Sequence, residues 1–280
     1  MTRLNALAIT ALFSITLVFG FSSCKKKGCT NSSATNYDSE AKKDDGSCVL
    51  PDDNNNNNGT TGTTDISILA SNFYNSNVTF TVGTQYITIS TNNEPDHKSM
   101  YYPTSHALYE AYSEPSNPDF FKNPNTISAQ NYVFTIPRYP AEATTKTATD
   151  FDAIGVAING VVFYNQVAAP GDDIMDEVHS FDQYEGHPTN TGSYHHHTEP
   201  VYLTGIKGND ALIGILLDGF PIYGPYEAGV KLTNDNLDDY HGHFSATAEF
   251  PDGIYHYHAT DDLPWLNGGE YYGTAGSFTN

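Results

Sequence analysis

The chain contains the same sequence pattern twice, and this duplication limits the folds that it can adopt. Residues 154–164 and 213–223 both fit I-G-aliphatic-x-aliphatic-[N/D]-G-apolar-x-apolar-Y. Residues 181–197 and 237–258 both fit apolar-D-x-Y-x-G-H, a spacer, and then G-x-Y-H-x-H. The blocks follow in the same order, so the repeats extend over about 154–200 and 213–264. Because half of such a duplication cannot bury its own apolar face, we expect one domain with pseudo-twofold symmetry.

Turn signals and alternating apolar residues predict strands. Asn159-Gly160 and Asp218-Gly219 separate short apolar runs and suit type I′ turns, so each block predicts a β-hairpin. Residues 78–82 and 86–90 alternate around a Gly-Thr turn, and residues 132–136 form a further candidate strand. We therefore expect a mainly β domain, a duplicated β-sandwich or barrel-like fold with long loops.

Helix signals are weak. The one short candidate helix covers residues 105–112, and a cluster of acidic residues leaves helix open around 171–179.

The first 23 residues resemble a bacterial lipoprotein signal peptide. Arg3 precedes a mostly apolar run, and Phe21-Ser22-Ser23-Cys24 resembles a lipobox, in which the cysteine carries the lipid. The alternative is an uncleaved membrane anchor. The resemblance implies a lipid-anchored protein of the bacterial cell envelope, at the outer membrane, in the periplasm or on the cell surface.

A small module and a linker follow. Residues 24–48 comprise a tether and a segment that resembles a short C-T-x-x-x-A-x-N-Y…D-D-G-S-C module of secreted bacterial proteins. An oxidising compartment favours a Cys29–Cys48 disulfide, and the Asp cluster could hold Ca²⁺ or simply form a spacer. Residues 49–64 are polar and predict a flexible linker. The remaining residues, 65–280, are enough for one β-rich domain.

The charge of the chain excludes one class of partner. Removing residues 1–23 takes away one of 12 basic residues and none of 33 acidic ones, so the formal charge becomes 11 − 33 = −22. Nucleic-acid binding depends on Lys and Arg, so we expect none. An acidic surface suits cation binding or solubility.

Histidines dominate both repeats. Nine of the 11 histidines lie between residues 179 and 258. In a strand, residues i and i+2 point to the same face, so each H-x-H sequence offers two imidazoles together, and the histidine after the earlier glycine could supply a third. Three histidines suit zinc or Cu(II). The predicted metal ligands are His187, His195, His197, His243, His256 and His258.

Other acidic and histidine side chains are candidates for supporting roles. Asp182 and Asp238 occupy matched positions, where they could orient an imidazole or bind the metal directly. Asp239 and His97 are further candidates for additional ligands. The alternative is that the histidines are structural, with their imidazoles hydrogen-bonded inside aromatic layers. The sequence also leaves open whether the six histidines form one site at the symmetry axis or two separate sites.

The residues Gly253-Ile254-Tyr255-His256-Tyr257-His258, with the Asp-Gly block upstream, resemble the YHYH-domain family, which is named for that tetrapeptide. The resemblance covers roughly residues 85–265 and includes residues 93–97. The first repeat departs from it, since His196 stands where tyrosine is expected. The family is largely uncharacterised, so the resemblance implies a domain type and no activity.

Three functions remain open from the sequence. The first is binding of a transition metal, copper or zinc. The second is surface recognition of a glycan or protein by Tyr-rich faces, with structural histidines. The third is a His-ligated zinc hydrolase, for which the sequence identifies no catalytic residue.

Overall fold

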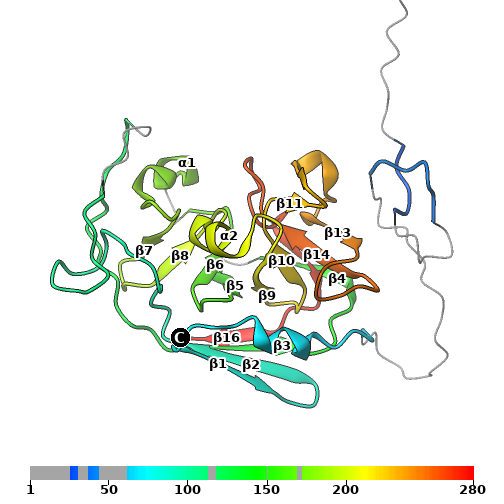
Figure 1. Ribbon diagram of the computed structural model, residues 1–280, viewed down its shortest axis with the longest axis horizontal. Helices are drawn as coiled ribbons and strands as arrows, with labels where there is room; N and C mark the ends of the chain where they lie inside the picture. Colours follow the sequence, from blue (N-terminus) through cyan, green and yellow to red (C-terminus); the bar gives the residue numbers. More distant parts are fainter. Residues whose placement is uncertain (1–25, 31–36, 44–61, 113–117, 150, 169–171) are drawn as a thin grey trace, which may run out of the picture.

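The protein is described by a computed structural model that covers residues 26–30, 37–43, 62–112, 118–149, 151–168 and 172–280. Two large sheets make up most of the fold (Figure 1). The four-stranded sheet has the order β1 (Val78–Val82), β2 (Tyr86–Thr91), β3 (Tyr132–Pro137) and β16 (Ser277–Thr279). The eight-stranded sheet has the order β13 (Gly242–Ser245), β14 (Ile254–His258), β10 (Pro221–Tyr223), β9 (Leu212–Leu216), β5 (Ala153–Ala157), β6 (Val162–Tyr164), β8 (Tyr194–His196) and β7 (His187–Pro188).

Smaller elements complete the domain. Two short antiparallel pairs are β11 (Tyr226–Glu227) with β12 (Val230–Lys231), and β15 (Glu270–Gly273) with β4 (Glu142–Ala148). The helices are α1 (Ile174–Glu177) and α2 (Val201–Lys207), and the 3-10 turns are η1 (Ile66–Ser71), η2 (Val178–Ser180) and η3 (Asn234–Asn236).

The eight-stranded sheet is built symmetrically around its centre. Val156 of β5 pairs with Ile215 of β9, and the flanking pairs are Gly155 with Leu216 and Ala157 with Gly214. In the two repeats Gly155 corresponds to Gly214, Val156 to Ile215 and Ala157 to Leu216. If each residue is replaced by its counterpart, the same three pairs are obtained. A twofold axis therefore passes between β5 and β9, perpendicular to the sheet. From this axis outward the orders are β5-β6-β8-β7 and β9-β10-β14-β13. The predicted internal repeat is confirmed.

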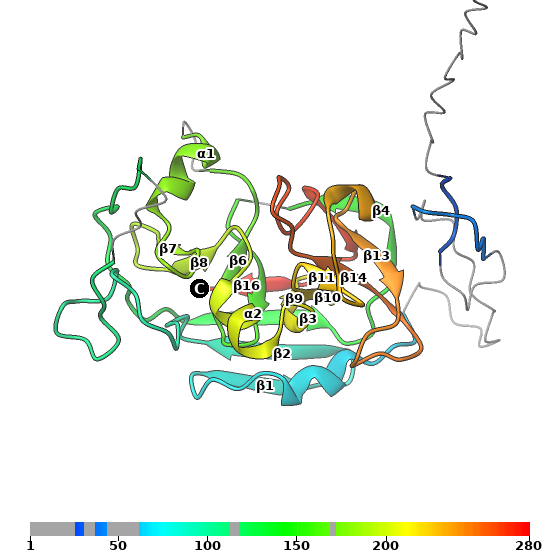
Figure 2. The same ribbon diagram turned by 45° about the horizontal axis from the view of Figure 1, so that its top comes forward.

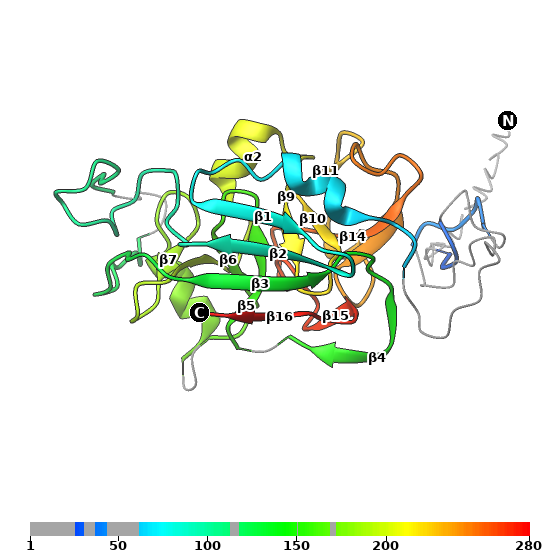
Figure 3. The same ribbon diagram turned by 90° about the horizontal axis from the view of Figure 1, so that it is seen from below.

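The two large sheets share one core. Alternate residues of β2 and β3 are buried, whereas every residue of β5 and β9 is buried. Side chains from both sheets belong to the same apolar cluster. The four-stranded sheet lies below the strands of the eight-stranded sheet in Figure 1, and Figure 3 shows its strands side by side from below. The prediction of a mainly β fold is confirmed, and the eight-stranded sheet is open, with β7 and β13 at its edges rather than joined in a barrel.

The hairpin turns of the two repeats contact the four-stranded sheet, but their type differs from the expectation. Positive φ falls only on the glycines, at 89° for Gly160 and 87° for Gly219, and not on Asn159 or Asp218. The amide of each glycine donates to the carbonyl three residues earlier, at 2.8 and 3.0 Å. This is a three-residue loop closed by a glycine bulge and not a type I′ turn. The hairpins predicted from the sequence are therefore present, with a different turn.

Replacing Gly219 with alanine is expected to destabilise the domain. A Cβ atom at Gly219 would lie 2.7 Å from the carbonyl oxygen of Pro137, and the backbone has a left-handed conformation. Holding a non-glycine residue there costs about 1–3 kcal/mol, and the clash adds to that cost. Urea denaturation of Gly219→Ala measures the loss. Gly205→Ala, where a Cβ atom meets nothing within 4 Å, is the control. Equal stability of both variants would contradict this assignment.

Helices differ most from the sequence-based expectation. Residues 105–112 contain turns and a bridge instead of the predicted helix, because Ser99 pairs with Tyr109 and ties this loop to the residues before it. A short helix, α1 followed by η2, is present in the acidic stretch, where the sequence leaves a helix possible. Helix α2 was not predicted, although Lys207 followed by Gly208 is a typical helix end.

Much of the N-terminal part lies outside the described residues. These include the predicted signal peptide, Cys24, Cys48 and all but the end of the linker. Cys29 is buried, and Asp38 of the module forms an ion pair with Lys26 at 2.7 Å. The disulfide and the calcium site remain predictions. Within the described ranges, none of the helices has both the length and the apolar character needed to cross a bilayer.

Candidate metal centres

Three histidines of the first repeat converge at one edge of the eight-stranded sheet. His187 lies on β7 directly opposite His195 on β8, and His197 follows two residues later on the same face. The Nε2 atom of His195 lies 3.0 Å from Nε2 of His187 and 3.0 Å from Nε2 of His197. All three side chains are buried. We call this group the N-terminal triad.

The second repeat builds the same arrangement at the opposite edge. His243 on β13 pairs with His256 on β14, and His258 shares the face of His256. The Nε2 atoms of these three histidines have no hydrogen-bond partner among the described residues. With Glu227 they offer ligand atoms that all lie within 4.8 Å of one another. We call these three histidines the C-terminal triad.

The two triads are separate. Four strands, β10, β9, β5 and β6, lie between β14 and β8. At a spacing of about 4.8 Å between neighbouring strands, β8 and β14 are roughly 24 Å apart. Figure 2 shows β7 and β8 at one end of the sheet and β13 and β14 at the other. The six predicted histidines therefore form two separate clusters, and they do not meet at the symmetry axis.

Backbone carbonyls set the protonation of the rings. Nδ1 of His195 faces the oxygen of Ser193 at 3.1 Å, and Nδ1 of His256 faces the oxygen of Ile254 at 3.0 Å. A carbonyl only accepts, so Nδ1 carries the proton and Nε2 of the neutral ring presents a bare lone pair.

The last histidine of each triad follows the same rule. Nδ1 of His197 donates to the oxygen of Asn165 at 2.5 Å, and Nδ1 of His258 donates to the oxygen of Gly224 at 2.8 Å. The short Nε2–Nε2 contact between His195 and His197 consequently has no proton to share. Bare lone pairs that face one another in this way are the arrangement that a bound cation requires.

A glutamate carboxylate lies beside each histidine triad. Oε2 of Glu177, at the end of α1, lies 3.6 Å from Nε2 of both His187 and His197. Glu227 of β11 lies 3.3 Å from Nε2 of His243 and 3.7 Å from Nε2 of His256. A zinc ion bound tetrahedrally to nitrogen at about 2.0–2.1 Å holds its ligand atoms about 3.3 Å apart. Three histidines and Glu227 therefore fit one ion in the second repeat, whereas in the first repeat the three histidines alone converge and Glu177 lies beside two of them.

Sequence analysis missed both glutamates. Glu177 belongs to a short helix, whereas Glu227 belongs to a two-residue strand, so the two do not occupy matched positions in the repeat. The only available signal was their place among several acidic residues close to each histidine block. Their contacts with the triads come from tertiary structure.

Burial keeps the imidazoles neutral. It lowers the pKa of His187 from its ordinary value of 6.5 to about 3, with neighbouring histidines adding to the effect, and that of His197 to about 4. Burial also lowers the pKa of His195, His256 and His258. Burial opposes ionisation of Glu227, but His243 and His256 hold the pKa of its carboxyl well below its ordinary value. His195, His197, His256 and His258 are therefore ready to bind a metal at neutral pH without releasing protons from their Nε2 atoms.

The metal-free domain is expected to lose stability as the pH falls from about 6.5 towards 4. The unfolded chain takes up protons on its histidines in this range, whereas burial holds the pKa of the native histidines lower. Burial raises the pKa of Asp182 and Asp218 to about 6 and also raises the pKa of Asp238 and Glu199, and these four carboxyl groups act in the opposite sense. The eight histidines with a lowered pKa outnumber them. Denaturation at several pH values after chelation measures the effect, and unchanged stability across the range would contradict it.

Asp182 and Asp238 contact the faces of β8 and β14 that lie opposite the triad histidines. Asp182 accepts a hydrogen bond from the hydroxyl of Tyr194 at 2.8 Å, and Asp238 accepts one from Tyr255 at 3.0 Å. In the described residues neither carboxylate accepts a hydrogen bond from an imidazole, which differs from the expected contact. The reason is strand alternation, which places these tyrosines on the face opposite the adjacent ligand histidine. Asp239 is exposed.

His97 lies apart from both triads. Its ring is close to His196, which alternation places on the face of β8 opposite His195 and His197.

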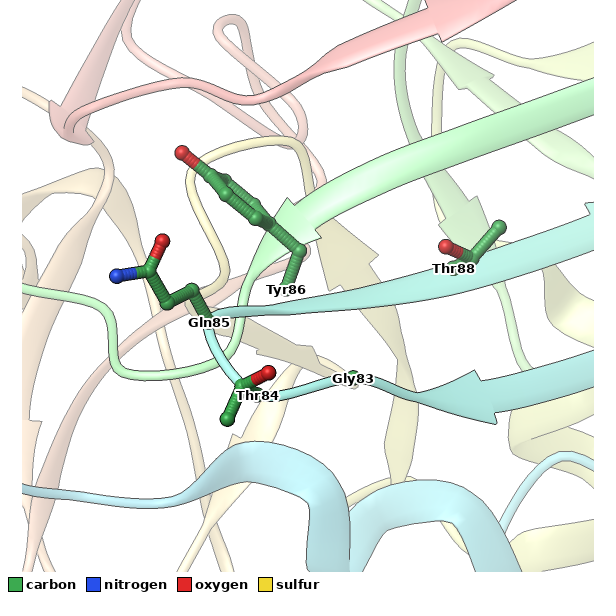
Figure 4. A pocket seen from close by; sticks show the side chains of 5 residues that line it. All are labelled: Gly83, Thr84, Gln85, Tyr86 and Thr88. Atoms are coloured by element: carbon green, nitrogen blue, oxygen red, sulfur yellow. The ribbon is translucent and has the colours of Figure 1, made fainter.

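A shallow surface hollow lies elsewhere, at the β1–β2 turn (Figure 4). Its lining contains no histidine and no carboxylate, and consists of Gly83, Thr84, Gln85, Tyr86 and Thr88. It is therefore not part of the candidate metal centres.

Comparison with known proteins identifies the domain. The model of the family described as YHYH protein matches residues 133–235 and 227–269. The β domain of this chain belongs to the YHYH family. The resemblance noted in the sequence is thereby confirmed, although the match begins after residues 93–97. Both triads and both glutamates lie within the matched part of the YHYH domain. No curated protein and no solved structure matches the chain.

Proposed function

We propose that the YHYH domain binds two transition-metal ions, zinc or copper, one in each triad. The observation that carries this proposal is the 3.0 Å approach of two bare Nε2 atoms, those of His195 and His197, in the N-terminal triad. A hydrogen-bonded structural role for these rings does not account for it, because the proton of His195 and His197 lies on Nδ1. The recurrence of three histidines and a carboxylate at both ends of the sheet supports the same function.

The ligand set favours holding an ion over hydrolysis. A catalytic zinc site keeps one coordination position open for water, whereas a closed site uses four protein ligands. Glu227 would occupy the fourth position of the C-terminal triad, and Glu177 lies 3.6 Å from two histidines of the N-terminal triad. We therefore place metal binding or sequestration ahead of a zinc hydrolase. Recognition of a glycan or protein stays an alternative only if the triads bind no metal.

Metal analysis of the untagged full chain tests the proposal. Mass spectrometry of protein purified from the cell envelope is expected to find close to two zinc or copper ions per chain. Chelation is expected to lower the thermal midpoint, because an ion that binds only the native state stabilises it by mass action. A folded protein that stays free of metal after incubation with zinc and copper would overturn the proposal and favour recognition.

We also propose that lipid on Cys24 anchors the protein in the bacterial cell envelope. The support is the leader and its lipobox-like end, both outside the described residues. Cys24→Ala is expected to move the protein from the membrane fraction and to abolish labelling with a palmitate analogue. Unchanged labelling of that variant would contradict lipidation at this cysteine.

A further inference from the structure

A second pair of histidines, His196 of the first repeat and His97 from the segment before it, lies outside both triads. His97 and His196 are both buried, and their ring centroids are 6.4 Å apart. Three tyrosines surround His97, with the rings of Tyr184, Tyr202 and Tyr194 at 4.5, 5.0 and 5.6 Å. Neither His97 nor His196 has a hydrogen-bond partner for its Nε2 atom among the described residues. Two buried acceptors without a donor call for a ligand.

The hydrogen bond made by Nδ1 fixes the tautomer of the His97 and His196 rings. Nδ1 of His97 donates to the oxygen of Lys98 at 3.0 Å, and Nδ1 of His196 donates to the oxygen of Glu185 at 2.8 Å. Both Nε2 atoms therefore present bare lone pairs, as in the triads. What is missing at this place is a cation or a hydrogen-bond donor.

The second repeat shows that the fold does not need this pair. Tyr257 takes the place of His196, and its hydroxyl donates to Asp218 at 2.6 Å. The counterpart of Asp218 is Asn159, which donates to Asp96 instead. The second repeat thus closes this face with a hydrogen bond from Tyr257 to Asp218, whereas at the matching place His196 and the nearby His97 have no partner for Nε2 among the described residues. The difference is a property of this site and not of the duplicated fold.

We propose that His97 and His196 bind one Cu(I) ion, separate from the two triads. Within the triads the ring centroids are 4.6–5.7 Å apart. The ring centroids of His97 and His196 are 6.4 Å apart, wider than within the triads, and two imidazoles are a ligand number that suits a two-coordinate Cu(I) ion.

Charge favours a monovalent ion at this pair. No carboxylate is bonded to either Nε2 atom, so a bound ion keeps its full charge. The desolvation cost of a buried ion grows with the square of its charge, so a divalent ion would cost about four times as much as a monovalent one. Cu(I) meets these conditions, whereas zinc and Cu(II) suit the carboxylate-containing triads.

Anaerobic titration tests this site independently of the triads. The full chain is first loaded with zinc, and Cu(I) is then added in competition with a chromophoric Cu(I) chelator. We expect one equivalent of Cu(I) per chain with no loss of zinc. His97→Gln and His196→Gln are each expected to abolish this equivalent and to keep the zinc. X-ray absorption of the copper-loaded protein is expected to show a two-coordinate nitrogen site.

His241→Gln is the matched control. His241 is a buried histidine of the second repeat whose Nε2 is already hydrogen-bonded to Thr260 at 3.0 Å, so this variant is expected to keep the Cu(I) equivalent. Absence of Cu(I) binding by the parent chain, or its retention in His97→Gln, would overturn the inference and leave a buried water between the two rings. If the triads did not bind metal, the chain would take up no zinc in the first step of the titration. This outcome differs from the loss of Cu(I) binding in the second step.

Discussion

The double variant His256→Gln, His258→Gln is expected to bind one metal ion fewer per chain than the parent. It removes two of the four groups that converge in the second repeat and leaves His243 and Glu227. Loss of a residue that only supports a ligand typically costs 10–100-fold in metal affinity, so loss of two ligands is expected to cost more than about 100-fold. Mass spectrometry after equilibration with limiting zinc measures the remaining ion, which the N-terminal triad holds.

The fold of this variant is expected to persist in the metal-free state. A glutamine amide can still donate to the backbone oxygens of Ile254 and Gly224 that now accept from the imidazoles. His106→Gln is the control, because His106 is exposed and stacks on Tyr102 outside both triads. If the double variant failed to fold and the parent never held a metal, the histidines would be structural and surface recognition would be the better function.

Asp182→Ala is expected to lower the free energy of unfolding by about 4 kcal/mol, because each buried donor left without a partner costs about 1–3 kcal/mol. Asp182 is almost fully buried and accepts from Ser99, from the hydroxyl of Tyr194 at 2.8 Å and from the amide of Tyr184 at 2.9 Å. Urea denaturation of the metal-free protein measures the change.

The same substitution is expected to weaken metal binding in the N-terminal triad. Tyr194 precedes the ligand His195 on β8, and the bond from its hydroxyl to Asp182 holds that strand in place. We expect a loss of about 10–100-fold in affinity at this triad and none at the other. Asp239→Ala, at an exposed acidic residue of the second repeat, is expected to change stability by no more than about 0.5 kcal/mol. A stable Asp182→Ala protein with full affinity would show that this carboxylate supports neither the fold nor the triad.

Local pattern accounts for the parts of the fold that were predicted. The hairpin of residues 78–90 and the strand from Tyr132 were predicted because alternation reports directly which side of a strand is buried. The helices were not predicted, because α1 and α2 are too short for a helical period to stand out. The turn type was missed because an Asn-Gly or Asp-Gly pair suits more than one hairpin loop.

The six histidines of the triads were identified from the sequence for a simple reason. Each H-x-H pair follows from the twofold period of a strand, and the third histidine follows from antiparallel pairing of β7 with β8 and of β13 with β14. These are short-range relations within a hairpin. The pairing of His97 with His196 could not be obtained in this way, because 99 residues separate them and no repeated pattern connects them.

The sequence by itself determined the duplication, the mainly β character and the histidines of each triad, because repeat identity and strand alternation are local properties of the chain. Only the tertiary structure decided that the histidines form two clusters and which glutamate lies beside each. The twofold axis lies between β5 and β9, so the triads fall at opposite edges of the sheet instead of meeting. Glu177 and Glu227 reach the triads from unlike elements, through packing between segments that no sequence period relates.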